Sequence, residues 1–206
     1  TATDSVKVTD VNNVESYYKT TQIENLTTPD DVINFKNAPS LIINEVKGWE
    51  CFGVDGIIGS DLFASTIVSI DSQTKNIIVT SAEKPSTASL RKMLNFTKEG
   101  GMPIINVQIA PVSNITALFD TGSHSLLSLI ESDFERIEPE ASMEVVSEGY
   151  GEGSIGVAGQ AEKASSYRVH IPLLSVGATK FRNLTTHTDK HPYTLLGVKL
   201  LQYGKV

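Results

Sequence analysis

The chain has 206 residues, a formal net charge of −7 at pH 7 and a hydrophobic fraction of 40%. This length and composition suit one or two small globular domains with real cores. Lysine and arginine form no cluster, which makes nucleic acids and anionic membranes poor partners. No apolar run in the sequence is long enough to span a bilayer.

Cysteine and histidine give no sign of a metal site. Cys51 is the only cysteine, which excludes an internal disulfide and a multi-cysteine metal site, and we expect it to be a structural thiol. The four histidines lack the HxxH and HExxH spacings of zinc sites. The sequence therefore predicts neither a metal nor a cofactor.

In the first part of the chain, short runs rich in valine, isoleucine and threonine predict strands. We expect two or three strands over residues 5–28, with a hairpin turn at Asn12-Asn13. A buried strand is expected at 41–43. A β-hairpin is expected with its strands at 67–70 and 77–79.

Residues 82–101 have a different pattern. Leu90, Met93 and Leu94 fall at i, i+3 and i+4, which predicts a short amphipathic helix. We place the boundary between two lobes in this stretch.

In the second part, alternating residues predict a half-buried strand at 105–109, followed by a strand at 115–119. A short helix is expected to present Ile130, Phe134 and Ile137 on one face and to end before Pro139. The glycine-rich stretch 149–156 is interpreted as a hairpin tip, because strands at 157–160 and 167–171, and no helix, are expected after it.

The strand at 115–119 leads directly into Asp120, which Thr121, Gly122 and Ser123 follow. Gly122 lets the backbone approach the carboxylate closely. The two hydroxyl groups can bond the carboxylate or tie the turn. The arrangement suits a catalytic carboxylate, and the alternative for so short a motif is ordinary turn chemistry.

The two halves of the chain resemble each other in three segments that occur in the same order. Residues 57–63 align without gaps on 195–201. Phe35-Lys36-Asn37 matches Phe181-Arg182-Asn183, and residues 18–26 resemble 167–174. Three ordered matches indicate an internal duplication.

A duplicated β lobe with Asp-Thr-Gly early and Leu195-Leu196-Gly197 late resembles the pepsin/retropepsin superfamily of aspartic peptidases. Residues 145–206 look especially like retropepsin-like peptidases of Bacteroides-type bacteria. The resemblance implies an all-β fold of two barrel-like lobes, with a psi-loop and few short helices. The expected first lobe covers 1–82, a linker with a short helix covers 83–102, and the second lobe covers 103–206.

The resemblance also implies an activity, namely hydrolysis of peptide bonds by a water molecule activated between two aspartate carboxylates. Asp120 would be one of them, held by Thr121, Gly122 and Ser123 and buttressed by Leu196 and Gly197. Less specific expectations are substrate contacts from Tyr150, Gly151 and Gly153. The implied substrate is a peptide or an unfolded protein, and the implied location is the periplasm or cell envelope.

Two departures from the family pattern leave alternatives open. No Asp-Thr-Gly or Asp-Ser-Gly occurs in residues 1–59, and the spacing from Gly122 to Gly197, applied to Gly59, places that signature before Thr1. We therefore expect an internal piece of a longer protein, with a second segment or chain completing the first lobe and the last strand of the second lobe missing. The alternative is a catalytically inactive, two-lobed peptide-binding module, and a structural or adhesive exported domain comes third.

Overall fold

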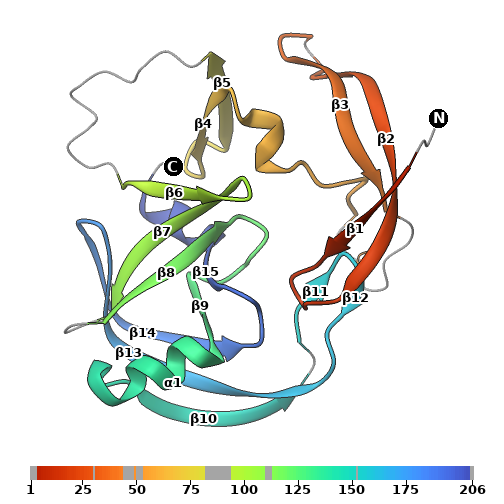
Figure 1. Cartoon of the computed structure of the whole chain (residues 1–206). Helices are drawn as coiled ribbons and strands as arrows, with labels where there is room; N and C mark the ends of the chain where they lie inside the picture. Colours follow the sequence, from red (N-terminus) through yellow and green to blue (C-terminus); the bar gives the residue numbers. More distant parts are fainter. Residues whose placement is uncertain are drawn as a thin grey trace. The chain divides into compact units, whose positions relative to one another are not determined.

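The computed structural model describes residues 4–29, 31–43, 49, 53–81, 94–109, 113–151 and 153–204. The fold is mostly β, with one α-helix and short 3-10 helices among these residues, in line with the expected β class (Figure 1). By its internal contacts the chain divides into two compact units. One is Thr1–Leu62 with Glu152–Lys163, and the other is Phe63–Gly151 with Ala164–Val206.

The lobe boundaries expected at 82 and 102 stay a prediction. Within the expected linker, Phe96–Glu99 forms strand β6, which pairs with β7. Of the residues that predicted a helix there, Leu90 and Met93 lie outside the described residues, as does Cys51.

The first unit contains an antiparallel sheet of three strands, β1 (Ser5–Thr9), β2 (Glu15–Thr27) and β3 (Asn34–Ile42). The turn between β1 and β2 confirms the predicted hairpin, because Asn13 adopts a positive φ of 59° there. The short strands β11 (Ile155–Gly156) and β12 (Gly159–Gln160) form a second hairpin of this unit.

The glycine-rich tip is fastened to the β1–β2 turn. Asn12 Nδ2 donates to the carbonyl groups of Ser154 and Gly159, both at 3.2 Å, and the Ala158 N–H donates to Asp10 Oδ2 at 3.2 Å. A Cβ on Gly156 would overlap the Asp10 carboxylate. The strand predicted at 157–160 is reduced to β12, since the polar turn holds the backbone before it.

One prediction of a buried strand in this unit is wrong. Leu41 and Ile42 lie in β3, but they are 41% and 40% exposed. Ile57 and Ile58 are 64% and 60% exposed and form no strand, although the 3-10 helix η2 (Ser60–Phe63) follows Gly59 directly. A run of aliphatic residues favours a strand, but whether that strand is buried depends on side chains from distant parts of the chain.

The second unit begins with the predicted hairpin, made of β4 (Thr66–Asp71) and β5 (Asn76–Ser81). Asp71 Oδ1 accepts hydrogen bonds from the N–H groups of Gln73 and Thr74, which fixes the turn. Ser72 Oγ donates to the Leu201 carbonyl at 2.6 Å and so ties the hairpin to the 3-10 helix η4 (Val198–Tyr203).

Six strands of the second unit form a closed barrel, which appears at the lower left of Figure 1. They are β7 (Met102–Ile109), β8 (Ser113–Asp120), β15 (Thr194–Gly197), β9 (Leu127–Ile130), β14 (Thr179–Asp189) and β13 (Ala164–Val176). Pairing of β13 with β7, as in Leu174 opposite Ile109, closes the ring. The strand β10 (Glu144–Gly151) extends the sheet beside β13.

The barrel interior is the hydrophobic core of the second unit. Val107, Ile109, Ile115 and Ala117 are at most 3% exposed, which confirms the alternation predicted for the strand at 105–109 and shows the same pattern in β8. Other core side chains include Leu127, Leu129, Val169, Ile171, Leu174 and Leu196. The core thus fixes the register of the strands that end at Asp120 and Gly197.

The helix α1 (Glu131–Ala141) packs Phe134 and Ile137 against this core. Its predicted bounds are wrong at both ends, because Ile130 ends β9 and the helix continues through Pro139. Proline lacks an N–H and crowds the preceding turn. Pro139 lies two residues before the helix end, so its missing N–H costs one hydrogen bond. The burial of Phe134, Ile137 and Ala141 offsets that cost.

Two hairpins, one in each unit, share the same pairing pattern. In β2–β3, Leu26 lies opposite Phe35 and Asn25 opposite Lys36; in β13–β14, Leu174 lies opposite Phe181 and Leu173 opposite Arg182. The next residues, Asn37 and Asn183, both have a φ of 54°. The sequence match 35–37 with 181–183 is therefore also a match of local structure.

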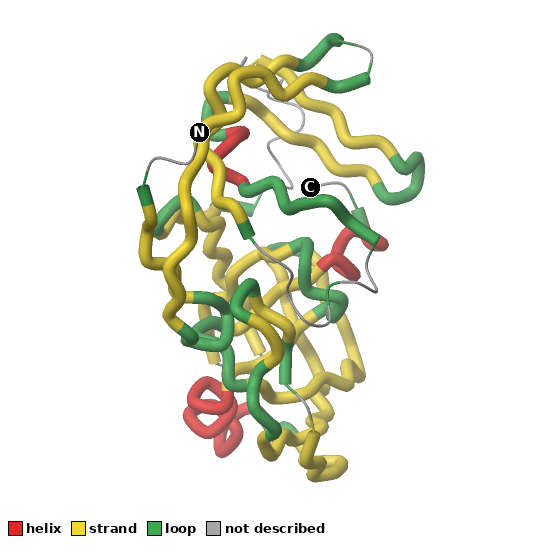
Figure 2. The backbone as a smooth tube through the Cα atoms, turned by 90° about the vertical axis from the view of Figure 1, so that its right-hand side faces the viewer, coloured by secondary structure: helices red, strands yellow, loops and turns green. Residues whose placement is uncertain are grey.

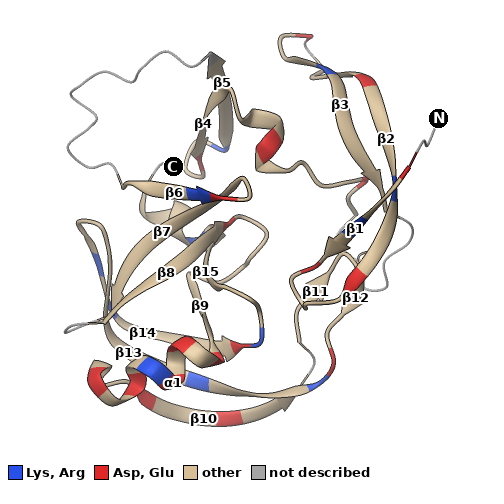
Figure 3. Ribbon diagram, viewed as in Figure 1, with Lys and Arg blue, Asp and Glu red and all other residues tan. Residues whose placement is uncertain are grey.

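The described residues show neither a membrane-crossing helix nor a metal-binding group. None of their helices is long and apolar enough to cross a membrane. They contain no group of three or more histidine, cysteine, aspartate or glutamate residues that could hold a metal ion. Lysine and arginine are scattered along the ribbon, as Figure 3 shows, and the smooth trace in Figure 2 gives the same fold from the side.

Candidate functional site

Asp120 is the last residue of β8 and lies opposite Gly197, the last residue of β15. Strand β15 runs parallel to β8 on one side and antiparallel to β9 on the other. Segments 113–120 and 127–130 therefore flank a strand that comes more than sixty residues later in the chain. This places the end of β15 beside the turn that follows Asp120.

The turn holds the Asp120 carboxylate by local hydrogen bonds. The Gly122 N–H donates to Asp120 Oδ1 at 2.8 Å, and the Ser123 N–H donates to the Asp120 carbonyl at 3.1 Å. Asp120 is half-buried, and Thr121 and Gly122 are exposed. A carboxylate fixed on one oxygen and reachable by solvent can bind a water molecule or a ligand through the other oxygen.

Gly197 packs directly against this turn. A Cβ on Gly197 would overlap the carbonyl oxygens of Ser123 and Ser125 and come within 2.9 Å of Ser123 Oγ. The backbone φ of −98° is ordinary for any residue, so the requirement for glycine is one of space. Further hydrogen bonds join the segments, from Gly197 N–H to the Leu126 carbonyl and from Val198 N–H to the Ser123 carbonyl.

Two histidines and an aspartate from the β14 end lie near this turn. Asp189 Oδ2 is 3.1 Å from His191 Nε2 and 4.0 Å from His187 Nε2. Ser128 Oγ on β9 is 3.4 Å from the same His187 nitrogen. The His191 side chain is only 5% exposed, and its Nδ1 has no partner among the described residues.

Burial lowers the pKa of both histidines. For His191, burial outweighs the nearby carboxylates of Asp189 and Asp120, which raise its pKa, and His187 adds a further lowering. For His187, burial again dominates, Asp189 opposes it and His124 lowers the pKa further. Both imidazoles are therefore neutral at neutral pH, and Asp120 is close enough to affect the titration of His191.

We expect the free energy of unfolding to fall as the pH decreases through 6.5 toward the lowered pKa of His191. The unfolded chain takes up the proton near pH 6.5, whereas the folded chain resists it, so stability is complete above 6.5 and is lost below. His191→Gln should reduce this pH dependence in urea unfolding curves recorded between pH 7.5 and 5. An unchanged pH dependence in the variant would contradict the assignment.

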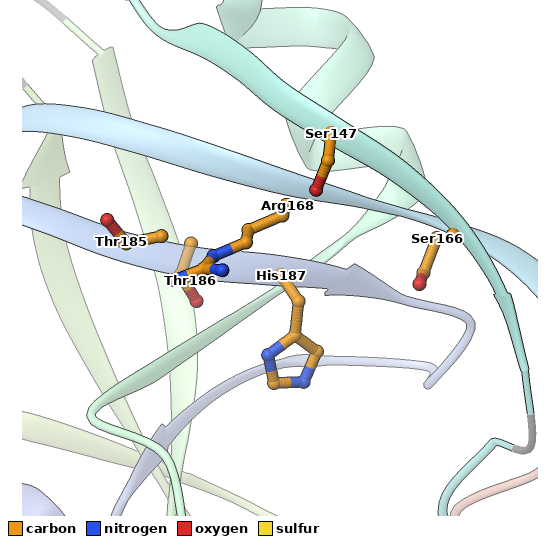
Figure 4. A pocket seen from close by; sticks show the side chains of 7 residues that line it. Ser147, Ser166, Arg168, Thr185, Thr186 and His187 are labelled. Atoms are coloured by element: carbon orange, nitrogen blue, oxygen red, sulfur yellow. The ribbon is translucent and has the colours of Figure 1, made fainter.

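A second polar site lies on the strands β10, β13 and β14 of the same unit. It is a pocket of about 270 Å³, lined by Ser147, Gly149, Ser166, Arg168, Thr185, Thr186 and His187. Figure 4 shows Arg168 extending from β13 across β14 toward Thr186, with the Ser147 hydroxyl group beside the start of its side chain and Ser166 farther along the strands. His187 belongs both to this pocket and to the group around Asp189.

The residues that were expected to contact substrate belong to different compact units. Tyr150 and Gly151 end β10, opposite Ser165 and Ala164 of β13, and Tyr150 is 73% exposed. Gly153 belongs to the first unit, where a Cβ would lie 2.7 Å from the Ala161 Cβ. A role for these three residues in binding substrate stays a prediction.

Sequence reasoning missed the histidine group and Arg168. His187, Asp189 and His191 alternate along the end of β14 and beyond it, which is a weak signal of a shared face in a strand. Arg168 meets Ser147 and His187 only through pairing across strands that lie far apart in the chain. No local motif indicates that contact.

Comparisons of the chain with models of protein families, with curated proteins and with solved structures find no match.

Proposed function

We propose that this chain is the Asp120-bearing part of an aspartic-type endopeptidase. The observation that carries the proposal is the fixing of the Asp120 carboxylate by the Gly122 N–H, on a turn that only a glycine at 197 leaves room for. A catalytic carboxylate needs one rigid geometry and access to water, and Asp120 has both features. The position of β15 between β8 and β9 is what a psi-loop requires.

In the proposed mechanism Asp120 works with a second carboxylate. Two carboxylates that face each other share one proton, because they cannot both ionise at low cost. The ionised member takes a proton from a bound water molecule, which attacks the peptide carbonyl. The protonated member stabilises the oxyanion and then helps to protonate the leaving amine. The chain's residues supply Asp120, and the second carboxylate belongs to a further segment or chain.

The duplicated, two-lobed architecture is part of the proposal. Its support is the common pairing of the two hairpins and the shared positive φ of Asn37 and Asn183. Gly59 and Gly197 are also each followed by a 3-10 helix, η2 and η4. In a duplicated fold, Ile57 and Ile58 occupy the place of the buried residues Leu195 and Leu196, and their exposure marks where flanking strands are needed.

A peptide-binding module without catalysis is the second candidate. It is favoured by the single Asp-Thr-Gly of the sequence. The described residues also show no second carboxylate hydrogen-bonded to Asp120. Such a module would use the same turn to hold a peptide. The resemblance to bacterial aspartic peptidases is the support for an exported location, at the cell envelope or in the periplasm.

Hydrolysis of an unfolded protein at mildly acid pH tests the proposal. We expect new peptide termini in mass spectra when the full-length protein is incubated with a reduced, alkylated protein substrate. A statine-type inhibitor, which imitates the tetrahedral intermediate, should suppress them because it binds more tightly than substrate. Binding of the substrate without cleavage would favour the peptide-binding module.

A further inference from the structure

The pocket on β10, β13 and β14 contains a cation, Arg168, that has no partner in the part of the chain that the structure describes. The Arg168 side chain has no hydrogen bond or ion pair with any described residue. This is notable in a chain with a net charge of −7, where acidic side chains outnumber basic ones. The other side chains of the pocket are hydroxyl groups and one imidazole. Since none of the described residues that line it is acidic, the pocket offers donors to an anion that comes from outside.

The strand register explains why these groups meet. Arg168 on β13 lies opposite Ser147 on β10 and opposite His187 on β14, so the three form one row across the sheet. Ser166 is two residues before Arg168, and Thr185 is two residues before His187. Side chains two apart on a strand point to the same face, so both flank the row. The donors are thus placed by paired strands of the closed barrel and its extension.

We propose that this pocket binds a carboxylate group of the peptide that the protein acts on. The guanidinium fork matches the two oxygens of a carboxylate, and hydroxyl groups can donate to the remaining lone pairs. One cation balances one negative charge, which suits a carboxylate better than a phosphate group. That the ligand is a peptide rests on the proposed function, whereas the preference for a carboxylate rests on the pocket alone.

The pocket is linked to the Asp120 turn through the histidine group. His187 lines the pocket, shares Asp189 with His191, and His191 lies within electrostatic reach of Asp120. A peptide bound at Asp120 and extending along β14 would therefore bring a neighbouring residue to Arg168. An acidic side chain or a C-terminal carboxylate are the two sources of the required group.

Binding of four small probes to the full chain, followed by NMR of the backbone amides, tests this proposal. N-acetylglutamate N-methylamide and its glutamine analogue differ only in the side-chain carboxylate. N-acetylalanine and N-acetylalaninamide differ only in the terminal carboxylate. We expect at least one acid to shift the amide signals of Ser147, Arg168 and His187. We expect its neutral analogue to bind at least about tenfold more weakly. Whichever acid binds identifies the source.

Arg168→Gln should abolish the difference between that acid and its neutral analogue. Arg182→Gln is the matched control. Arg182, on β14, is exposed as Arg168 is, but it does not line the pocket. Equal binding of acid and neutral probes to the wild type, or an equal loss in both variants, would overturn the proposal. The binding test does not depend on cleavage, because these probes are not cleaved. Acid-selective binding of a probe, together with no hydrolysis of an unfolded protein substrate, would refute the peptidase proposal and leave the carboxylate-binding proposal standing.

Discussion

Replacing Asp120 with asparagine is expected to lower the rate of peptide hydrolysis by about a thousandfold or more. Asparagine cannot share a proton with a second carboxylate and cannot take one from water. The fold should remain, because the side chains have nearly the same volume and Asn Oδ1 can still accept the hydrogen bond from the Gly122 N–H. The measurement is the initial rate of cleavage of an unfolded protein substrate, with the unfolding curve recorded on the same sample.

Asp55→Asn is the matched control for this experiment. Asp55 is exposed in the first unit. Its replacement by asparagine changes charge and volume as Asp120→Asn does, but outside the Asp120 turn. Its cleavage rate should equal that of the wild type. Undiminished hydrolysis by Asp120→Asn would remove Asp120 from the mechanism, and with it the peptidase proposal.

The second large effect is expected from Gly197→Val. The added side chain would overlap the carbonyl oxygens of Ser123 and Ser125, which belong to the backbone and cannot rotate away. We expect a loss of about 1–3 kcal/mol in the free energy of unfolding for Gly197→Ala and a larger loss for valine. Displacement of the 123–125 backbone should also lower hydrolysis, since Asp120 precedes that segment. Urea unfolding curves measure the first effect.

Gly204→Ala controls for the loss of glycine itself. Gly204 is extended, with a φ of 168°, and a Cβ there would contact nothing within 4 Å. Its free energy of unfolding should stay within about 0.5 kcal/mol of the wild-type value. Equal stability of Gly197→Val and the wild type would show that β15 does not buttress the turn.

The parts of the fold with strong local patterns could be predicted from sequence. Alternation over 105–109 predicted a strand because it follows the pleat of the backbone. The runs rich in isoleucine and valine at 67–70 and 77–79 predicted the two strands of a hairpin. The hairpin turn at Asn12-Asn13 was also predictable from local residues, because asparagine tolerates the positive φ that the turn requires. These features need no knowledge of the rest of the chain.

The features that sequence reasoning missed depend on distant contacts. The exposure of Leu41 and Ile57 depends on which distant side chains cover them, and the continuation of α1 through Pro139 follows from packing against the barrel. The pairing of Arg168 with His187 likewise joins separate strands. In the candidate site, the Asp120 turn has a local motif, whereas the histidine group and the Arg168 pocket have none.

A crystal structure of the full-length protein with a statine-type inhibitor would show whether two carboxylates flank the reacting group. We expect the inhibitor's hydroxyl group to lie within hydrogen-bond distance of the free oxygen of Asp120 and of a second carboxylate on its other side. Asp120 Oδ1 should keep its bond to the Gly122 N–H. An inhibitor hydroxyl that contacts no carboxylate, or Asp120 alone, would contradict the two-carboxylate mechanism.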